Sequence, residues 1–81
     1  MTRRPVDATE EALLAALVDW RRRLARAAGV PAYVIFPDAT LHAVAETRPT
    51  SRDALLALPG VGPVKLQRHG GAVLELVRAH G

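Results

Sequence analysis

Apolar positions recur along most of this 81-residue chain with the spacing of helices rather than of strands. The first stripe runs at steps of three and four residues, through Leu13, Leu17, Trp20, Leu24 and Ala27. It predicts a long amphipathic helix that is capped by Thr9, starts at Glu10 and ends at Gly29. Since Trp20 lies on this stripe, packing in the core is favoured over a role in base stacking.

A short apolar segment, residues 30–37, follows the first helix. Pro31 and Pro37 disfavour helix at the residues before them, so we expect an extended connector that crosses the domain. One of its apolar side chains should enter the core, with Val34, Ile35 and Phe36 as the candidates. Tyr33 is expected at the rim of the core, because its ring is apolar and its hydroxyl is polar.

Two further helices are predicted between residues 38 and 58. Asp38 should cap the first, which ends near Pro49. Thr50 and Asp53 resemble a capping box that opens the second, which Pro59 ends. The positions predicted to face inward are Leu41, Val44, Ala45, Leu55, Leu56 and Leu58, whereas His42 and Glu46 should point outward.

Residues 58–65 form a helix-hairpin-helix pattern, in which Gly60 and Gly62 bracket one apolar residue. Glycine permits the tight turn, and Pro63 suits the first position of a new helix. Backbone N–H groups at that helix terminus can receive a phosphate, although a turn that only closes a bundle would show the same residues. We expect a short helix over 63–69, a break at Gly70 and Gly71, and a last helix over about 72–80.

These elements predict a compact all-α bundle of about five helices with a helix-hairpin-helix-like turn. Residues 9–81 would make one domain with a modest core. Residues 1–8 contain charges and a proline but no periodic pattern, so we interpret them as a flexible N-terminal arm or the remnant of a linker.

The composition narrows the classes of function. A net charge of +3 and a pI near 10.6 favour polyanionic partners. Without cysteine the chain has no disulfide framework or thiolate metal site, and no apolar run approaches a membrane span, so we expect a soluble cytoplasmic protein. His42, His69 and His80 fall in three different predicted helices, and no nucleophile has a base nearby. We therefore predict no metal, no cofactor and no catalytic site.

Four arginines crowd the second half of the first helix: Arg21, Arg22, Arg23 and Arg26. Cations near a helix C-terminus are favourable for stability, and Asp19 can pair with Arg22 or Arg23. Arg26 has no acidic residue three or four positions away. The cluster is therefore consistent with a solvated face or with an anion-binding face.

Taken together, several blocks resemble the HRDC domain, the helicase-and-RNase-D C-terminal module of RecQ-type and some UvrD-type helicases. The matching positions are residues 30–36 and 38–41, Pro49, Leu55, residues 60–62, Lys65 and Gly70. The resemblance covers nearly the whole chain after the arm and is closest to the bacterial RecQ form. Ala32 departs from it, because relatives often have a second proline there.

The resemblance implies an accessory module of a DNA helicase of repair and recombination, without ATPase or nuclease chemistry of its own. It implies a nucleoid-associated monomer that contacts the catalytic core of the parent helicase. The module would bind single-stranded or partly single-stranded DNA weakly, through an exposed aromatic residue and a basic surface. The candidate binding residues are Tyr33, Lys65, Arg22, Arg23 and Arg26, with Arg68 and the hairpin glycines Gly60 and Gly62 beside them.

A docking module is the alternative to a DNA-binding module. The apolar rim around Tyr33 and Phe36 could pack on another domain or protein. The arginine face could also recognise carboxylates, since guanidinium groups bind these as well as phosphates.

Overall fold

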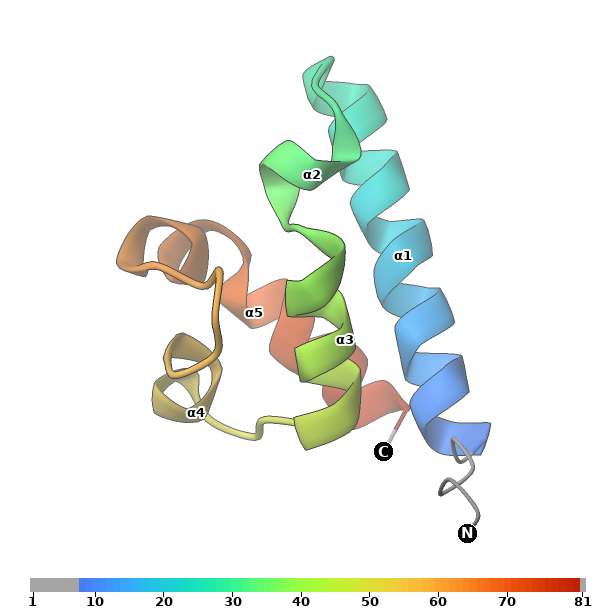
Figure 1. The fold of residues 1–81 in the computed structure, drawn as a ribbon, viewed down its shortest axis with the longest axis vertical. Coiled ribbons are helices and arrows are strands. Elements are labelled where there is room, and N and C mark those ends of the chain that lie inside the picture. Colours follow the sequence, from blue (N-terminus) through green and yellow to red (C-terminus); the bar gives the residue numbers. More distant parts are fainter. Residues whose placement is uncertain (1–7, 81) are drawn as a thin grey trace, which may run out of the picture.

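The computed structural model describes residues 8–80, which form five helices and no strand in that range (Figure 1). The helices are α1 (Ala8–Ala28), α2 (Ala32–Ile35), α3 (Asp38–Thr47), α4 (Arg52–Leu56) and α5 (Pro63–Ala79). The prediction of an all-α domain is confirmed. Residues 1–7 of the predicted arm lie outside the described residues. No helix within residues 8–80 has the length and apolar character needed to span a bilayer.

The core lies where α1 meets α3 and α5. Figure 1 shows α1 along one side of the molecule, α3 beside it, and α4 on the far side of α3. The side chains with almost no exposed surface are Leu13, Leu17, Phe36, Leu41, Val44, Leu55 and Val73. The helical stripes therefore predicted most of this core, because three- and four-residue steps place their members on one face.

The starts of three helices differ from the prediction. α1 already begins at Ala8, so Thr9 lies inside the helix instead of capping it. Asp38 is the first residue of α3 and follows Pro37, which has extended backbone angles. α4 is capped by Ser51, whose Oγ accepts a hydrogen bond of 3.1 Å from the Ala54 N–H, and not by Thr50. The observed helix starts thus differ from the predicted ones by one or two residues, which is the usual uncertainty of helix ends.

The predicted extended connector contains the one-turn helix α2, so that prediction was wrong. The two prolines restrict only the residues before them, and Phe36 is indeed extended before Pro37. Between the prolines, nothing prevents a helical turn. Ile35 and Phe36 are buried, whereas Tyr33 and Val34 are exposed.

The predicted break at Gly70 and Gly71 is also wrong, because α5 runs without interruption from Pro63 to Ala79. Two glycines cost a helix about 1 kcal/mol each. Packing compensates at Gly70, which is buried. A Cβ there would lie 2.9 Å from the Leu66 side chain and 3.5 Å from Arg52 of α4. The missing side chain therefore leaves room for the Leu66 side chain one turn earlier in α5, with the Arg52 guanidinium of α4 beside it.

The number of helices matches the prediction for a different reason. The unpredicted helix α2 adds one, and the two helices predicted over 63–69 and 72–80 are the single helix α5. α3 has the predicted orientation, since Leu41, Val44 and Ala45 are buried while His42 and Glu46 are exposed. In α4 only Leu55 is fully buried. Leu56 is 39% exposed, contrary to the prediction that it faces inward, whereas Leu58, just after α4, is half-buried and packs against the core as predicted.

Candidate nucleic-acid interface

The hairpin before α5 is held against α3 by a side chain. Gly60 has a φ of +84°, which L-residues with a Cβ rarely adopt. The Thr40 hydroxyl donates a hydrogen bond of 2.8 Å to the Pro59 carbonyl, and a Cβ on Gly60 would collide with the Thr40 side chain. Thr40 is buried, and the sequence analysis had given it no role at the hairpin. Its contact with Pro59 fixes where α5 begins.

The start of α5 carries positive charge without acidic neighbours. Gly62 is its N-cap and forms no side-chain cap, and the first turn contains no acidic residue. Lys65 and Arg68 follow in the first two turns, and neither forms an ion pair within residues 8–80. Both charges add to the positive end of the helix dipole, which attracts anions.

Lys65 contacts the segment that carries Tyr33. The Lys65 ammonium lies 5.4 Å from the centroid of the Phe36 ring, a cation–π contact. Phe36 directly follows α2, and Tyr33 on that helix is 69% exposed. The Tyr33 ring is therefore available to a ligand. The structure thus brings Lys65 to the end of the turn that presents the Tyr33 ring.

An aromatic cluster lies next to this contact. The ring centroids of Trp20 and Phe36 are 6.1 Å apart, and His69 lies 5.7 Å from Trp20 and 5.8 Å from Phe36. Burial, followed by the charges of Arg68 and Lys65, lowers the pKa of His69 below 6.5. Trp20 packs against the core as predicted, but it keeps part of its surface exposed.

The three candidate arginines of α1 are all exposed. Arg23 pairs with Asp19, with Nε 3.1 Å from Oδ2, so Arg23 is the partner among the two that were predicted. Arg22 and Arg26 form no ion pair within residues 8–80. The candidate cations therefore lie on two helices, Arg22, Arg23 and Arg26 on α1 and Lys65 and Arg68 on α5.

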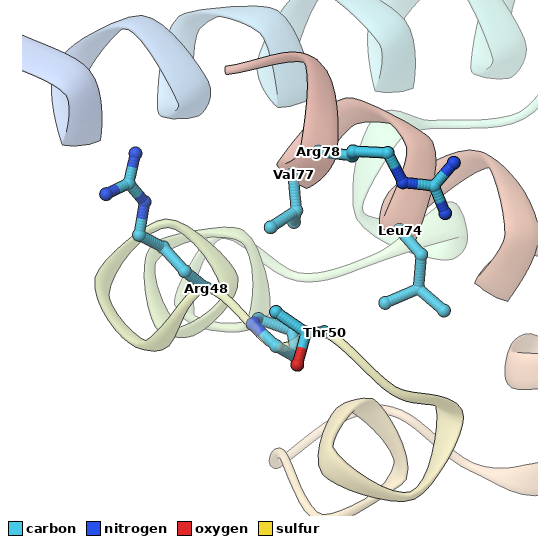
Figure 2. A pocket seen from close by; sticks show the side chains of 6 residues that line it. Arg48, Thr50, Leu74, Val77 and Arg78 are labelled. Atoms are coloured by element: carbon cyan, nitrogen blue, oxygen red, sulfur yellow. The ribbon is translucent and has the colours of Figure 1, made fainter. Parts of the chain in front are cut away.

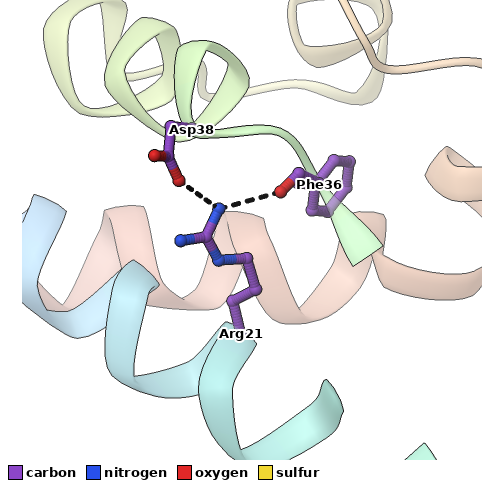
Figure 3. Close-up of polar contacts among 3 residues, drawn as sticks. All are labelled: Arg21, Phe36 and Asp38. Carbon is purple, nitrogen blue, oxygen red and sulfur yellow. Dashed lines mark hydrogen bonds and ion pairs between the residues drawn. The ribbon is translucent and has the colours of Figure 1, made fainter. Parts of the chain in front are cut away.

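Arg21 has a structural role that the sequence analysis missed. Its Nη1 donates a hydrogen bond of 2.9 Å to the Phe36 carbonyl and lies 2.7 Å from Oδ1 of Asp38, as Figure 3 shows. Only 11% of the Arg21 side chain is exposed. The one signal in the sequence was its position beside the apolar stripe. Arg21 thereby fixes Phe36, and with it the aromatic cluster, against α1.

A groove of about 370 Å³ lies elsewhere, between the connector after α3 and the C-terminal half of α5 (Figure 2). It is lined by Arg48, Pro49, Thr50, Leu74, Val77 and Arg78, and none of these is a predicted binding residue. Arg48 has a φ of 51° and donates a hydrogen bond of 2.8 Å to the His80 carbonyl, so it caps α5. The groove is therefore separate from the hairpin and its cations.

Comparison with protein families gives one match that spans most of the chain. The sequence model of the HRDC domain family matches residues 10–77. A solved structure described as D. radiodurans RecQ HRDC domain 3 superimposes with a TM-score of 0.81 and 31% identity. That match covers 86% of this chain and 92% of the other.

Comparison with curated proteins gives parts of two kinds of helicase. The chain is 51% identical over 69 residues to the ATP-dependent DNA helicase UvrD2 of Mycobacterium tuberculosis, covering 85% of this chain and 10% of the helicase. It is 38% identical over 68 residues to the ATP-dependent DNA helicase RecQ of Haemophilus influenzae, covering 84% and 11%. The chain thus spans about a tenth of the length of these relatives.

Proposed function

Because this chain belongs to the HRDC domain family, we propose that it is a non-catalytic accessory module of a larger DNA helicase. In this role it binds single-stranded or partly single-stranded DNA weakly and without sequence specificity. The DNA helicases UvrD2 and RecQ support the proposal, since a domain of this size is one part of each.

The observation that carries the DNA-binding proposal is the position of Lys65 beside the segment that exposes Tyr33. Proteins that hold a single strand without reading its sequence combine cations along the backbone with a ring on which a base stacks. Tyr33 supplies the ring, and Lys65 supplies a cation at the end of the same turn. Arg68 extends the positive charge along α5. The backbone N–H groups of the first turn after Gly62 lie at the same N-terminal end of this helix.

The expected affinity is low because few phosphates are engaged. Each neutralised phosphate adds about 0.7 to the salt slope on single strands, and two to four of them give roughly micromolar or weaker binding. Stacking of one base contributes about 1 to 3 kcal/mol. A weak contact of this kind suits a module that is tethered to a helicase core which itself holds the strand.

Fluorescence anisotropy of a labelled single-stranded oligonucleotide, measured at low and high salt, tests the proposal. Tyr33→Ala should weaken binding about tenfold, since it removes one stacked base. Its matched control is Val34→Ala, which removes an exposed apolar side chain from the same turn without removing a ring. Circular dichroism of each variant checks that helicity is retained.

The charge contribution has its own pair of variants. Lys65→Ala should lower the salt slope by about 0.7, whereas Arg78→Ala at the opposite end of α5 should leave the slope unchanged. Equal slopes for Lys65→Ala and the unmodified domain would remove Lys65 from the interface.

Docking on another domain is the second candidate function. Three large apolar side chains near the hairpin and α2 are exposed: Tyr33, Val34 and Val64. Burial of such side chains against a partner would remove apolar surface from water, which favours a protein contact. Absence of oligonucleotide binding even at low salt would overturn the DNA proposal and favour docking through these side chains.

A further inference from the structure

The aromatic cluster of Trp20, Phe36 and His69 has an inner and an outer part. Phe36 is 2% exposed and forms its base. Trp20 and His69 lie against it in edge-to-face or tilted contact, and both keep part of their surface exposed. Two rings from different helices, α1 and α5, therefore meet at the surface beside the Lys65 ammonium.

The charges around His69 lack a negative partner. The groups that face it are Trp20 from α1, Phe36 from the segment before α3, and Lys65 and Arg68 from its own helix. Only Lys65 and Arg68 are charged, and both are positive. Their charges act with burial to lower the pKa of His69. An anion placed here would relieve the repulsion between these groups.

The cation–π contact of Lys65 with Phe36 contributes to stability, but the helix dipole and the neighbouring charges of His69 do not favour this arrangement. Cations at the start of a helix oppose its dipole, and a histidine between two cations is held in its neutral form. A core position needs neither an imidazole nor two cations beside it, because an apolar ring would fill the same space. The combination matches what a single strand needs, namely ring surface next to positive charge.

We propose that Trp20 and His69, together with Lys65 and Arg68, form a second nucleotide-binding subsite for single-stranded DNA. This inference rests on the proposed DNA binding and assigns residues to it beyond Tyr33. A base stacks on the exposed surface of Trp20, and the adjacent phosphate contacts the His69 imidazole and the Arg68 guanidinium. The Lys65 ammonium lies over the Phe36 ring, which belongs to this cluster and directly follows the turn that carries Tyr33, so it serves both.

The first test uses Trp20 itself, because it is the sole tryptophan of the chain. Its emission, excited where tyrosine does not absorb, is followed while a short unlabelled oligonucleotide is added. Stacking of a base on the indole should quench the emission along the same curve that anisotropy gives for binding. Binding seen by anisotropy with no change in Trp20 emission would overturn the subsite and leave the proposed function standing.

The second test compares His69→Gln with the matched control His42→Gln, which changes an exposed histidine on α3 that has no ring contact with the cluster. A phosphate favours the protonated imidazole, so binding by the unmodified domain should tighten about threefold from about pH 8 to about pH 6 at constant salt. His69→Gln should lose this change, and His42→Gln should retain it. The same pH dependence in His69→Gln would overturn the role of His69.

Failure of the proposed DNA binding can be told apart from failure of the subsite alone. If the labelled oligonucleotide binds at no salt concentration, the proposed function fails and the subsite fails with it. Only the subsite is refuted if Tyr33→Ala weakens binding, DNA leaves the Trp20 emission unchanged, and His69→Gln keeps the same pH dependence of binding as the unmodified domain.

Discussion

The two long helices differ in the charges of their first turns, although both have an arginine in their last turn. α1 has Glu10 and Glu11 in its first turn and Arg26 in its last, so its charges follow the helix dipole. α5 has no acidic residue in its first turn and places Lys65 and Arg68 in its first two turns. The charges of α1 are those expected of a stable isolated helix, whereas those at the start of α5 are not.

This difference changes how the two groups of cations are interpreted. Three of the four arginines of α1 have explanations in stability: Arg21 is a buried anchor, Arg23 pairs with Asp19, and Arg26 lies at the favourable end of the helix. Lys65 contacts the Phe36 ring, but within residues 8–80 neither Lys65 nor Arg68 pairs with an acid, and both lie at the end of the helix where the dipole disfavours cations. The start of α5 is therefore the stronger evidence for an anion-binding surface.

The largest effect is expected at the turn that leads into α5. Gly60→Ala should lower the free energy of unfolding by about 3 kcal/mol, since a Cβ there strains the backbone and collides with Thr40. The matched control is Gly62→Ala, where φ is −98° and a Cβ meets nothing within 4 Å. Its change should stay within about 0.5 kcal/mol. Denaturant unfolding measures both, and equal values would contradict a hairpin fixed by Thr40.

A smaller loss is expected from the buried arginine of α1. Arg21→Met keeps most of the packing but leaves the Phe36 carbonyl without its donor, which should cost about 2 kcal/mol. Arg22→Met, on the exposed side of the same helix, should change stability by less than about 0.5 kcal/mol. Thermal unfolding of the two variants checks the contrast. Similar melting temperatures would show that Arg21 is not an anchor.

The smallest effect on stability is expected from changing the charge at the N-terminal end of α5 or at the C-terminal end of α1. Gly62→Asp supplies α5 with a capping carboxylate and should stabilise the domain by about 0.7 kcal/mol, while it weakens oligonucleotide binding through repulsion. Arg26→Glu places an acid at the C-terminal end of α1 and should destabilise by about 0.5 kcal/mol. If Gly62→Asp gained stability without any loss of DNA binding, the start of α5 would lie outside the interface.

Local signals predicted a large part of the fold. The stripe of α1 located its buried leucines, and Gly29 ends the helix with a φ of +70°. The prolines and glycines of residues 59–63 located the hairpin. These features depend on neighbours within one or two turns, which a sequence displays directly.

Signals that depend on packing were misinterpreted. Gly70 and Gly71 suggested a break, but Gly70 is buried under the Leu66 side chain and α5 continues through both glycines. The prolines beside α2 suggested an extended segment, although they leave its middle residues unrestricted. Of the candidate site, exposure of Tyr33 was anticipated, whereas the contact of Lys65 with Phe36 was not.

The sequence by itself determined the helical class, most of the core and the glycine turn, because hydrophobic spacing and backbone restriction act over a few residues. Only the tertiary structure decided that Arg21 anchors Phe36 and that Trp20 meets His69, 49 positions further along the chain. Such contacts depend on how the helices pack against one another, and the spacing of residues within one helix does not encode that arrangement.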